Sequence, residues 1–163
     1  MTAETGIGAR VKRKEDQRFL TGTGRYVDDL PLARATYAYF LRSPHAHAKI
    51  KAIDAGAALA MDGVAAVYTG ADLVADNIGT IPTLPIFKRP DGSPMQAPPR
   101  RLLAHEIVRF AGEPVAAVLA ASRADAQTAA EAIAVDYEIL PAVISPAEAL
   151  VPGAPVVWPD APD

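Results

Sequence analysis

The sequence contains no cysteine among its 163 residues. Disulfides, iron–sulfur clusters held by cysteine and zinc sites built from thiolates are therefore excluded within this chain. Any redox cofactor that is bound through cysteine must sit on another chain.

A long hydrophobic run is also missing. The longest apolar stretch, 114–121, is far shorter than the roughly 20 residues that a transmembrane helix needs. The first 16 residues mix charges of both signs and lack the apolar middle region of a secretory signal. These features predict a cytoplasmic protein that has no membrane partner.

Positive charge is not in excess, because 16 Lys and Arg face 19 Asp and Glu and leave a net charge of −3. A basic stripe of the kind that neutralises phosphates is absent, so nucleic acid is not an expected partner. The composition, with 50% hydrophobic and 21% charged residues, is typical of a globular protein. The length fits one folded domain.

Proline divides the chain, since it breaks helices and cannot donate to a β-ladder. Six of the 15 prolines fall between Gly79 and Arg101, and six more follow Leu140. The first cluster predicts a long surface loop, and loops of that length in compact domains are usually functional. The second cluster predicts an extended tail.

Strand and helix patterns alternate between these clusters. Alternation or β-favouring composition predicts strands at 36–42, 49–53, 64–68, 107–110, 115–120 and 135–140. The run 115–120 has no polar alternation, which is typical of a central strand covered on both faces. Asp54 is the expected N-cap of a short alanine-rich helix, and Ser145 that of a terminal helix around 147–150.

The clearest helix signal follows the central strand. Ser122 and Asp125 form a variant capping box, and small or apolar residues then recur at helical spacing, at Ala126, Ala129, Ala130 and Ile133. Such a face lets the helix lie close to a sheet. The layout indicates an α/β or α+β domain with one mixed sheet and an alanine-rich helix packed on it.

No candidate chemical site is convincing. His45 and His47 share one face of an extended segment, but only His105 could join them as a metal ligand, so a hydrogen-bonded structural role is the favoured alternative to zinc. The 22–24 GTG segment lacks the third glycine of a dinucleotide loop and predicts a turn. Asp28 and Asp29 are more typical of turns or salt bridges than of an acid–base pair.

Four segments together resemble one family. They are 18–29 (RFLTGTGRYVDD), 42–50 (RSPHAHAKI), 62–73 (DGVAAVYTGADL) and 108–118 (VRFAGEPVAAV), the last followed by 135–138 (VDYE) and 140–143 (LPAV). In this order they resemble the start of the molybdenum hydroxylase large subunit, the family of xanthine dehydrogenase, aldehyde oxidase and aerobic carbon monoxide dehydrogenase. The resemblance covers roughly residues 10 to 157.

The resemblance implies an α+β fold of the α/β-hammerhead type. It also implies an N-terminal arm at 1–17, the hammerhead domain at 18–150 and an extended tail at 151–163 that leads to molybdenum-binding domains. In the family, a molybdenum–molybdopterin centre carries out the oxidation, and [2Fe-2S] clusters and FAD sit on other domains or subunits, which become the expected partners. The family's catalytic and cofactor-binding motifs lie in later domains, so no catalytic, cofactor-binding or metal-binding residue is assigned here.

Two functional classes follow. The chain is either a non-catalytic structural part of an oxidoreductase, inactive by itself, or an independent module that holds a protein or ligand with the loop from Gly79 to Arg101. The substrate of a parent enzyme and the oligomeric state are left open, as is whether the chain is a fragment, a split-gene product or free-standing. We expect an apolar interaction patch near the loop and the tail, with Trp158 either exposed as an anchor or folded back onto its own domain.

Overall fold

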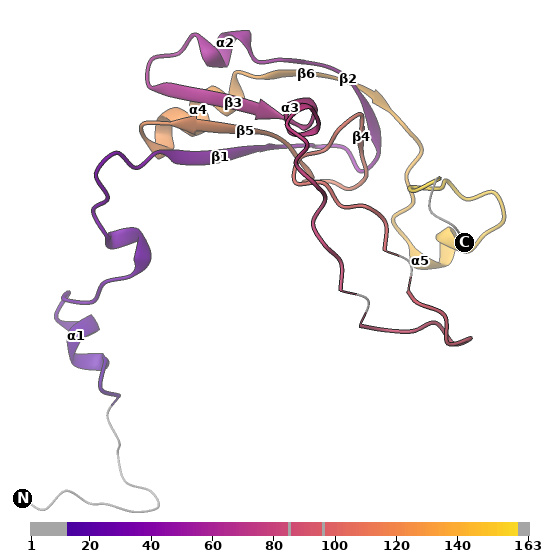
Figure 1. The fold of residues 1–163 in the computed structure, drawn as a ribbon, viewed down its shortest axis with the longest axis horizontal. Coiled ribbons are helices and arrows are strands. Elements are labelled where there is room, and N and C mark those ends of the chain that lie inside the picture. The colour runs from indigo at the N-terminus through magenta and orange to yellow at the C-terminus, as the bar shows by residue number, and fades with distance from the viewer. Residues whose placement is uncertain (1–12, 85, 96, 160–163) are drawn as a thin grey trace, which may run out of the picture. The chain divides into compact units, whose positions relative to one another are not determined.

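The computed structural model describes residues 13–84, 86–95 and 97–159 (Figure 1). The chain divides into two compact units, Met1–Ala35 and Thr36–Asp163. Each unit is described by itself below.

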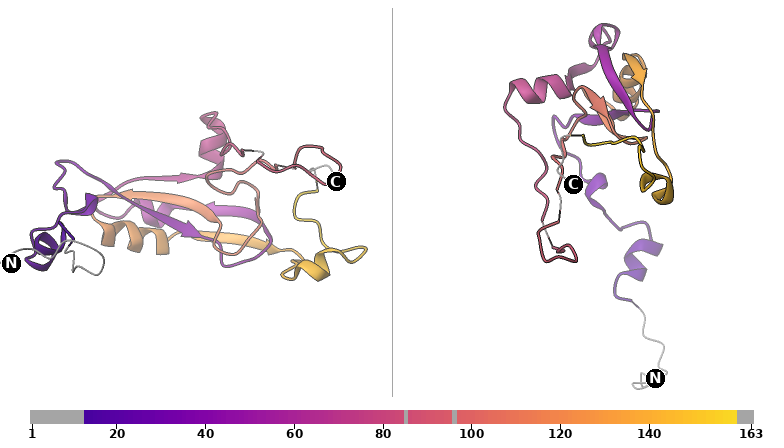
Figure 2. Two further views of the ribbon diagram at one scale, coloured as in Figure 1. Left: turned by 90° about the horizontal axis from the view of Figure 1, so that it is seen from below. Right: turned by 90° about the vertical axis from the view of Figure 1, so that its right-hand side faces the viewer.

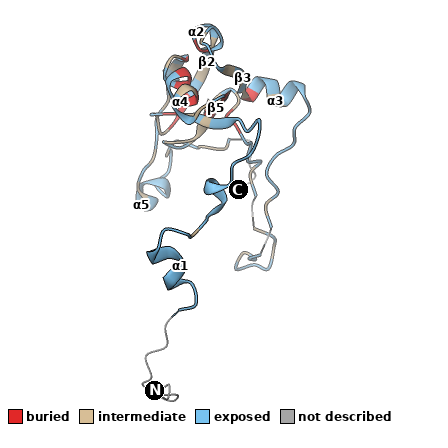
Figure 3. Ribbon diagram, turned by 90° about the vertical axis from the view of Figure 1, so that its left-hand side faces the viewer, coloured by how far each residue is buried: buried red, intermediate tan, exposed pale blue. Residues whose placement is uncertain are grey.

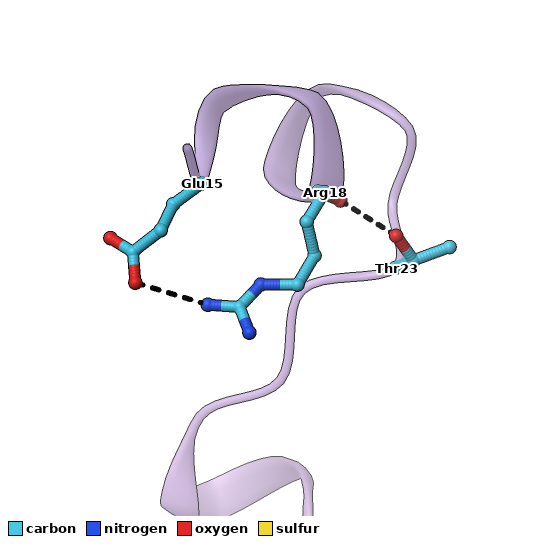
Figure 4. A network of polar contacts seen from close by, with 3 residues as sticks. All are labelled: Glu15, Arg18 and Thr23. Carbon is cyan, nitrogen blue, oxygen red and sulfur yellow. Dashed lines mark hydrogen bonds and ion pairs between the residues drawn. The ribbon is translucent and has the colours of Figure 1, made fainter. Parts of the chain in front are cut away.

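The first unit contains the helix α1 (Asp16–Leu20) and a 3-10 turn, Val27–Asp29. Arg18 links to the Glu15 carboxylate at 3.3 Å, and its carbonyl accepts a hydrogen bond of 3.0 Å from the Thr23 hydroxyl (Figure 4). None of the unit's described residues is buried. Its order therefore rests on local hydrogen bonds rather than on a core.

The first sheet of the second unit has the strand order β1–β5–β3. Its strands are β1 (Tyr37–Arg42), β3 (Val64–Thr69) and β5 (Pro114–Ala120), and both pairings are antiparallel. The central place of β5 confirms the prediction from its apolar run. No residue of β5 is exposed.

The second sheet has the order β4–β2–β6 and is also antiparallel. It contains β2 (Ala48–Asp54), β4 (Ile107–Val108) and β6 (Ala134–Ile139). The expectation of one mixed sheet is thus wrong in its detail, since the strands form two antiparallel sheets. The alternation of residues located the strands. Which strand pairs with which depends on contacts between distant residues, and the alternation within a single strand does not determine it.

The helix α4 (Arg123–Glu131) lies along one face of the β1–β5–β3 sheet (Figure 2, left). It begins as predicted, because the Ser122 hydroxyl accepts a hydrogen bond of 3.1 Å from the Asp125 amide. The four residues of its predicted inner stripe are all buried, and Figure 3 shows α4 with buried stretches in red beside exposed ones. Small side chains therefore set the close approach of the helix to the sheet.

Two clusters of buried residues form the core. The first joins α4 to the inner face of the β1–β5–β3 sheet and contains Ala58, Ala116, Val118, Ala129, Ala130 and Ile133. The second joins β5 to the β4–β2–β6 sheet and contains Ala48, Ala104, Val108 and Val115. Because β5 contributes to both clusters, it connects the two sheets.

Three short helices complete the unit. The first is α2 (Gly56–Leu59), whose N-cap is Ala55 and not the predicted Asp54; the Asp54 carboxylate instead accepts a hydrogen bond from the Gly56 amide at 2.8 Å. The helix α5 (Pro146–Ala149) begins after Ser145 as expected, but without a side-chain cap.

The third is α3 (Gly70–Ala75), which was not among the elements predicted from the sequence. Its start is a capping box between Thr69 and Asp72, and the T-x-x-D spacing was the signal that could have revealed it. Its first residue packs against the chain near Ala104, where a side chain at Gly70 would overlap the Ala104 carbonyl.

The predicted loop from Gly79 to Arg101 extends away from the sheets (Figure 1). Among its described residues the backbone pairs only at two isolated bridges, Ile81 with Arg100 and Lys88 with Pro94. Within the ranges described, no helix is long and apolar enough to cross a membrane.

Candidate functional site

The three histidines do not converge. His47 is buried, and its Nδ1 lies 2.8 Å from the Pro141 carbonyl oxygen, while the His45 ring meets the edge of Tyr137 with 4.9 Å between the ring centroids. His105 lies beside the start of α3. The structure thus gives His47 and His45 contacts that hold the β1–β2 connection against β6 and the segment after it.

No group of three or more His, Cys, Asp or Glu residues suited to a metal ion occurs at 13–84, 86–95 or 97–159. With no cysteine in the sequence, the chain has no thiolate that could ligate an iron–sulfur cluster.

The two motifs of the first unit have structural contacts. Gly22 has a φ of +71°, as a turn glycine needs, and the next residue closes the turn on Arg18. Asp29 accepts a hydrogen bond of 2.9 Å from the Tyr26 amide and so caps the 3-10 turn. These observations agree with the turn interpretations of the 22–24 segment and of Asp29.

The most prominent surface feature is the face of the β1–β5–β3 sheet that points away from α4, which we call the outer face. Strand register places Phe40 and Tyr68 on either side of Ala117 in one row across it. Phe40 is 45% exposed and Tyr68 is 41% exposed. We expected β5 to be covered on both faces. The structure covers it fully on the α4 side and only partly on the outer face.

A groove of about 390 Å³ runs over this row at the base of the long loop. Leu73 in α3, just before the loop, and Leu102, just after it, both line the groove. Sequence reasoning placed an apolar patch near the loop but missed its sheet component, because the alternation of β1 and β3 did not tell which face is covered.

A second cluster holds the tail to the domain. The Arg109 guanidinium lies over the Trp158 ring at 3.9 Å from its centroid, and its Nε donates to the Val157 carbonyl at 3.3 Å. Trp158 is consequently half-buried. Of the two alternatives for this residue, the structure favours the one in which it folds back.

Glu113 adds a carboxylate to this cluster. Its side chain accepts a hydrogen bond from the Arg109 backbone amide. Burial raises the pKa of Glu113 above its ordinary value, and the hydrogen bond from Arg109 and the charge of its guanidinium offset part of that rise. The cluster is a packing and electrostatic arrangement that lacks a nucleophile.

Comparison with known proteins defines the family. Residues 21–141 match the family described as aldehyde oxidase and xanthine dehydrogenase, a/b hammerhead domain. The chain belongs to this family. The match covers both sheets and α4, so the hammerhead fold expected from the sequence is confirmed.

Individual relatives agree with that assignment. The chain is 43% identical over 158 residues to the carbon monoxide dehydrogenase large chain of Afipia carboxidovorans, covering 97% of this chain and 18% of the relative. It is 40% identical over 157 residues to the nicotine 6-hydroxylase large subunit of Paenarthrobacter nicotinovorans, covering 96% of this chain and 18% of that one.

The solved structure of a Cu,Mo-CO dehydrogenase superposes with a TM-score of 0.80 at 42% identity, covering 97% of this chain and 18% of that chain. The aldehyde oxidoreductase from Desulfovibrio gigas gives a TM-score of 0.74 at 33% identity, covering 91% and 16%. The hammerhead domain described here therefore spans less than a fifth of the relatives it matches.

Proposed function

We propose that this chain is the non-catalytic N-terminal structural domain of a molybdopterin-dependent oxidoreductase large subunit of the xanthine dehydrogenase, aldehyde oxidase and carbon monoxide dehydrogenase type. The observation that carries the proposal is the similarity of nearly the whole chain to 18% of the length of each of three large chains or subunits.

The proposal includes an organisation and a set of partners. Residues 1–17 would be an arm, 18–150 the hammerhead domain and 151–163 a tail leading to molybdenum-binding domains. When bound in those domains, the molybdenum–molybdopterin centre supplies the redox chemistry, and [2Fe-2S] and FAD groups on other domains or subunits take up the electrons. A cytoplasmic location is part of the same proposal.

The contribution of this chain is structural. Buried His47 holds the β1–β2 connection to the Pro141 carbonyl, and Arg109 holds the segment near Trp158, so both segments are fixed to the rest of the second unit. A rigid domain of this kind can hold neighbouring domains in a fixed position.

The test is to express the chain alone and together with the rest of a large subunit from the same genome as a second polypeptide. We expect the chain alone to bind no stoichiometric molybdenum, iron or flavin and to show no oxidation, and the two polypeptides to co-purify. Stoichiometric molybdenum in the chain alone, measured by elemental analysis, would contradict the proposal.

The second candidate is a free-standing binding module. The long exposed loop and the groove at its base favour it, since both are surfaces that a partner or ligand could occupy. A stable monomer that purifies with an occupied groove and ignores the rest of the large subunit would favour this module over the structural domain.

A further inference from the structure

We propose that the outer face of the β1–β5–β3 sheet, including the groove at the base of the long loop, is the surface on which the remainder of the large subunit docks, through an apolar segment that brings a carboxylate to Arg42. This inference rests on the function proposed above and assigns that function to one surface.

The two faces of the sheet differ in how far they are covered. Its inner face packs on α4, whereas the outer face leaves Phe40, Tyr68 and the adjacent Leu102 between 41% and 49% exposed. Aromatic side chains of this size are costly to leave in water and are typical anchors of protein interfaces. A sheet with an apolar second face is normally completed by another layer of structure.

The shape of the face fits an inserted segment. Ala117 stands between Phe40 and Tyr68 in the strand register, so a small side chain separates two large ones. This alternation forms the groove of about 390 Å³, which Leu73 and Leu102 extend toward the loop. A groove of this kind accepts apolar side chains from a partner segment rather than a flat surface.

The charges next to the groove are mixed, because Asp72 directly precedes Leu73 and Glu113 directly precedes Pro114 in the chain. Among the described residues that line the groove itself, only Arg42 is charged, and its guanidinium donates to the Gly112 carbonyl at 2.8 Å. Arg100 and Arg101 are exposed and directly precede Leu102 in the chain. The complementary partner segment therefore combines apolar side chains with a carboxylate that reaches Arg42.

Charge and length decide between the alternatives for what covers the face. A second copy docked symmetrically through the same face would place the Arg42 of both copies in one interface, and the described groove lining contains no carboxylate to pair with either. The relatives, in contrast, contain about four-fifths of their length outside the portion that this chain matches. That remaining chain is the occupant to which we assign the face.

The cysteine-free sequence allows a direct test with single thiols. Ala117→Cys places a thiol in the groove, and Ala124→Cys, on the exposed side of α4, is the matched control. Each variant is labelled with a small maleimide alone and in the presence of the co-expressed rest of the large subunit. We expect complex formation to slow labelling at Ala117→Cys by about tenfold or more and to leave Ala124→Cys within about twofold.

A second pair of variants measures the contribution of the surface to association. Phe40→Ser should weaken the complex by about tenfold or more, while Leu59→Ser, which removes an exposed leucine from α2, should leave it unchanged. Circular dichroism of the free variants establishes that each is folded.

The outcomes separate this inference from the proposed function. If the polypeptides associate but the two thiols are slowed equally, or neither is slowed, the docking face is wrong and the proposed function stands. If they do not associate, both fail. If labelling at Ala117→Cys is already slow in the chain alone, something other than the rest of the large subunit occupies the face and the inference is overturned. A labelling rate that depends on protein concentration would identify a second copy as the occupant. A rate that does not depend on concentration would identify the long loop.

Discussion

Replacing Arg109 with methionine should release the tail without unfolding the domain. The substitution removes the guanidinium that lies 3.9 Å from the centre of the Trp158 ring and the hydrogen bond of 3.3 Å to the Val157 carbonyl. A half-buried cation–π pair contributes about 1 kcal/mol, and a hydrogen bond from a charged donor contributes about 1.5 kcal/mol. Losing both would raise the detached fraction of the tail by a factor of roughly 50–100.

Trp158 reports on this equilibrium by itself, because it is the only tryptophan in the chain. In the Arg109→Met variant its emission should shift to longer wavelength and acrylamide should quench it more efficiently. Arg101→Met is the matched control, since it removes an exposed arginine that does not contact the ring. Far-ultraviolet circular dichroism should be unchanged in both variants.

The reasoning is refuted if Arg109→Met leaves the emission maximum and the quenching at their original values. Trp158 would then be held by contacts other than the guanidinium. A red shift that is accompanied by loss of circular dichroism would instead show that Arg109 supports the whole domain and not only the tail.

Three further predictions concern the core, the buried carboxylate and the loop. Ala129→Leu should lower the free energy of unfolding by about 1–3 kcal/mol, because the larger side chain overpacks the helix–sheet contact. Glu131→Leu, on the exposed side of α4, should change it by less than about 0.5 kcal/mol. Equal urea midpoints for the two variants would show that the contact between α4 and the sheet tolerates a larger side chain. Because burial raises the pKa of Glu113, its stabilising contribution is present below the ordinary value of 4.5 and is lost as pH rises through the folded-state pKa. The Glu113→Gln variant should therefore become more stable relative to the original protein between pH 4 and pH 7. A difference in the free energy of unfolding that does not change with pH would contradict this. Limited proteolysis should cut first within 79–101, because only two isolated β-bridges pair the described backbone of this loop. Cleavage of other loops that leaves this one intact would show that it is well packed.

Local signals in the sequence determined most of the secondary structure. The apolar run of β5, the Ser122 cap and the alanine stripe of α4 each depend on neighbouring residues only, and the structure confirms all three. The family was also readable from the sequence, because four short segments occur in a fixed order and the comparison with known families agrees.

The errors at Asp54 and α3 have a local origin of a different kind. An aspartate can bond the amide two residues on without being the helix N-cap, which is what Asp54 does with Gly56. At α3 the T-x-x-D capping signal is present at Thr69, but it directly follows a predicted strand and the helix was not predicted.

Only the tertiary structure decided what depends on contacts between distant residues. The division of the strands into two antiparallel sheets, the outer face on which Phe40 meets Ala117 and Tyr68, and the pairing of Arg109 with Trp158 all join segments that are far apart in the chain. Periodicity shows that a strand has two faces, but the face that is covered depends on which other element folds onto it. In this protein the outer face is only partly covered, because Val115 packs on the second sheet while Phe40 and Tyr68 stay 45% and 41% exposed, and the surface we assign to docking follows from that difference.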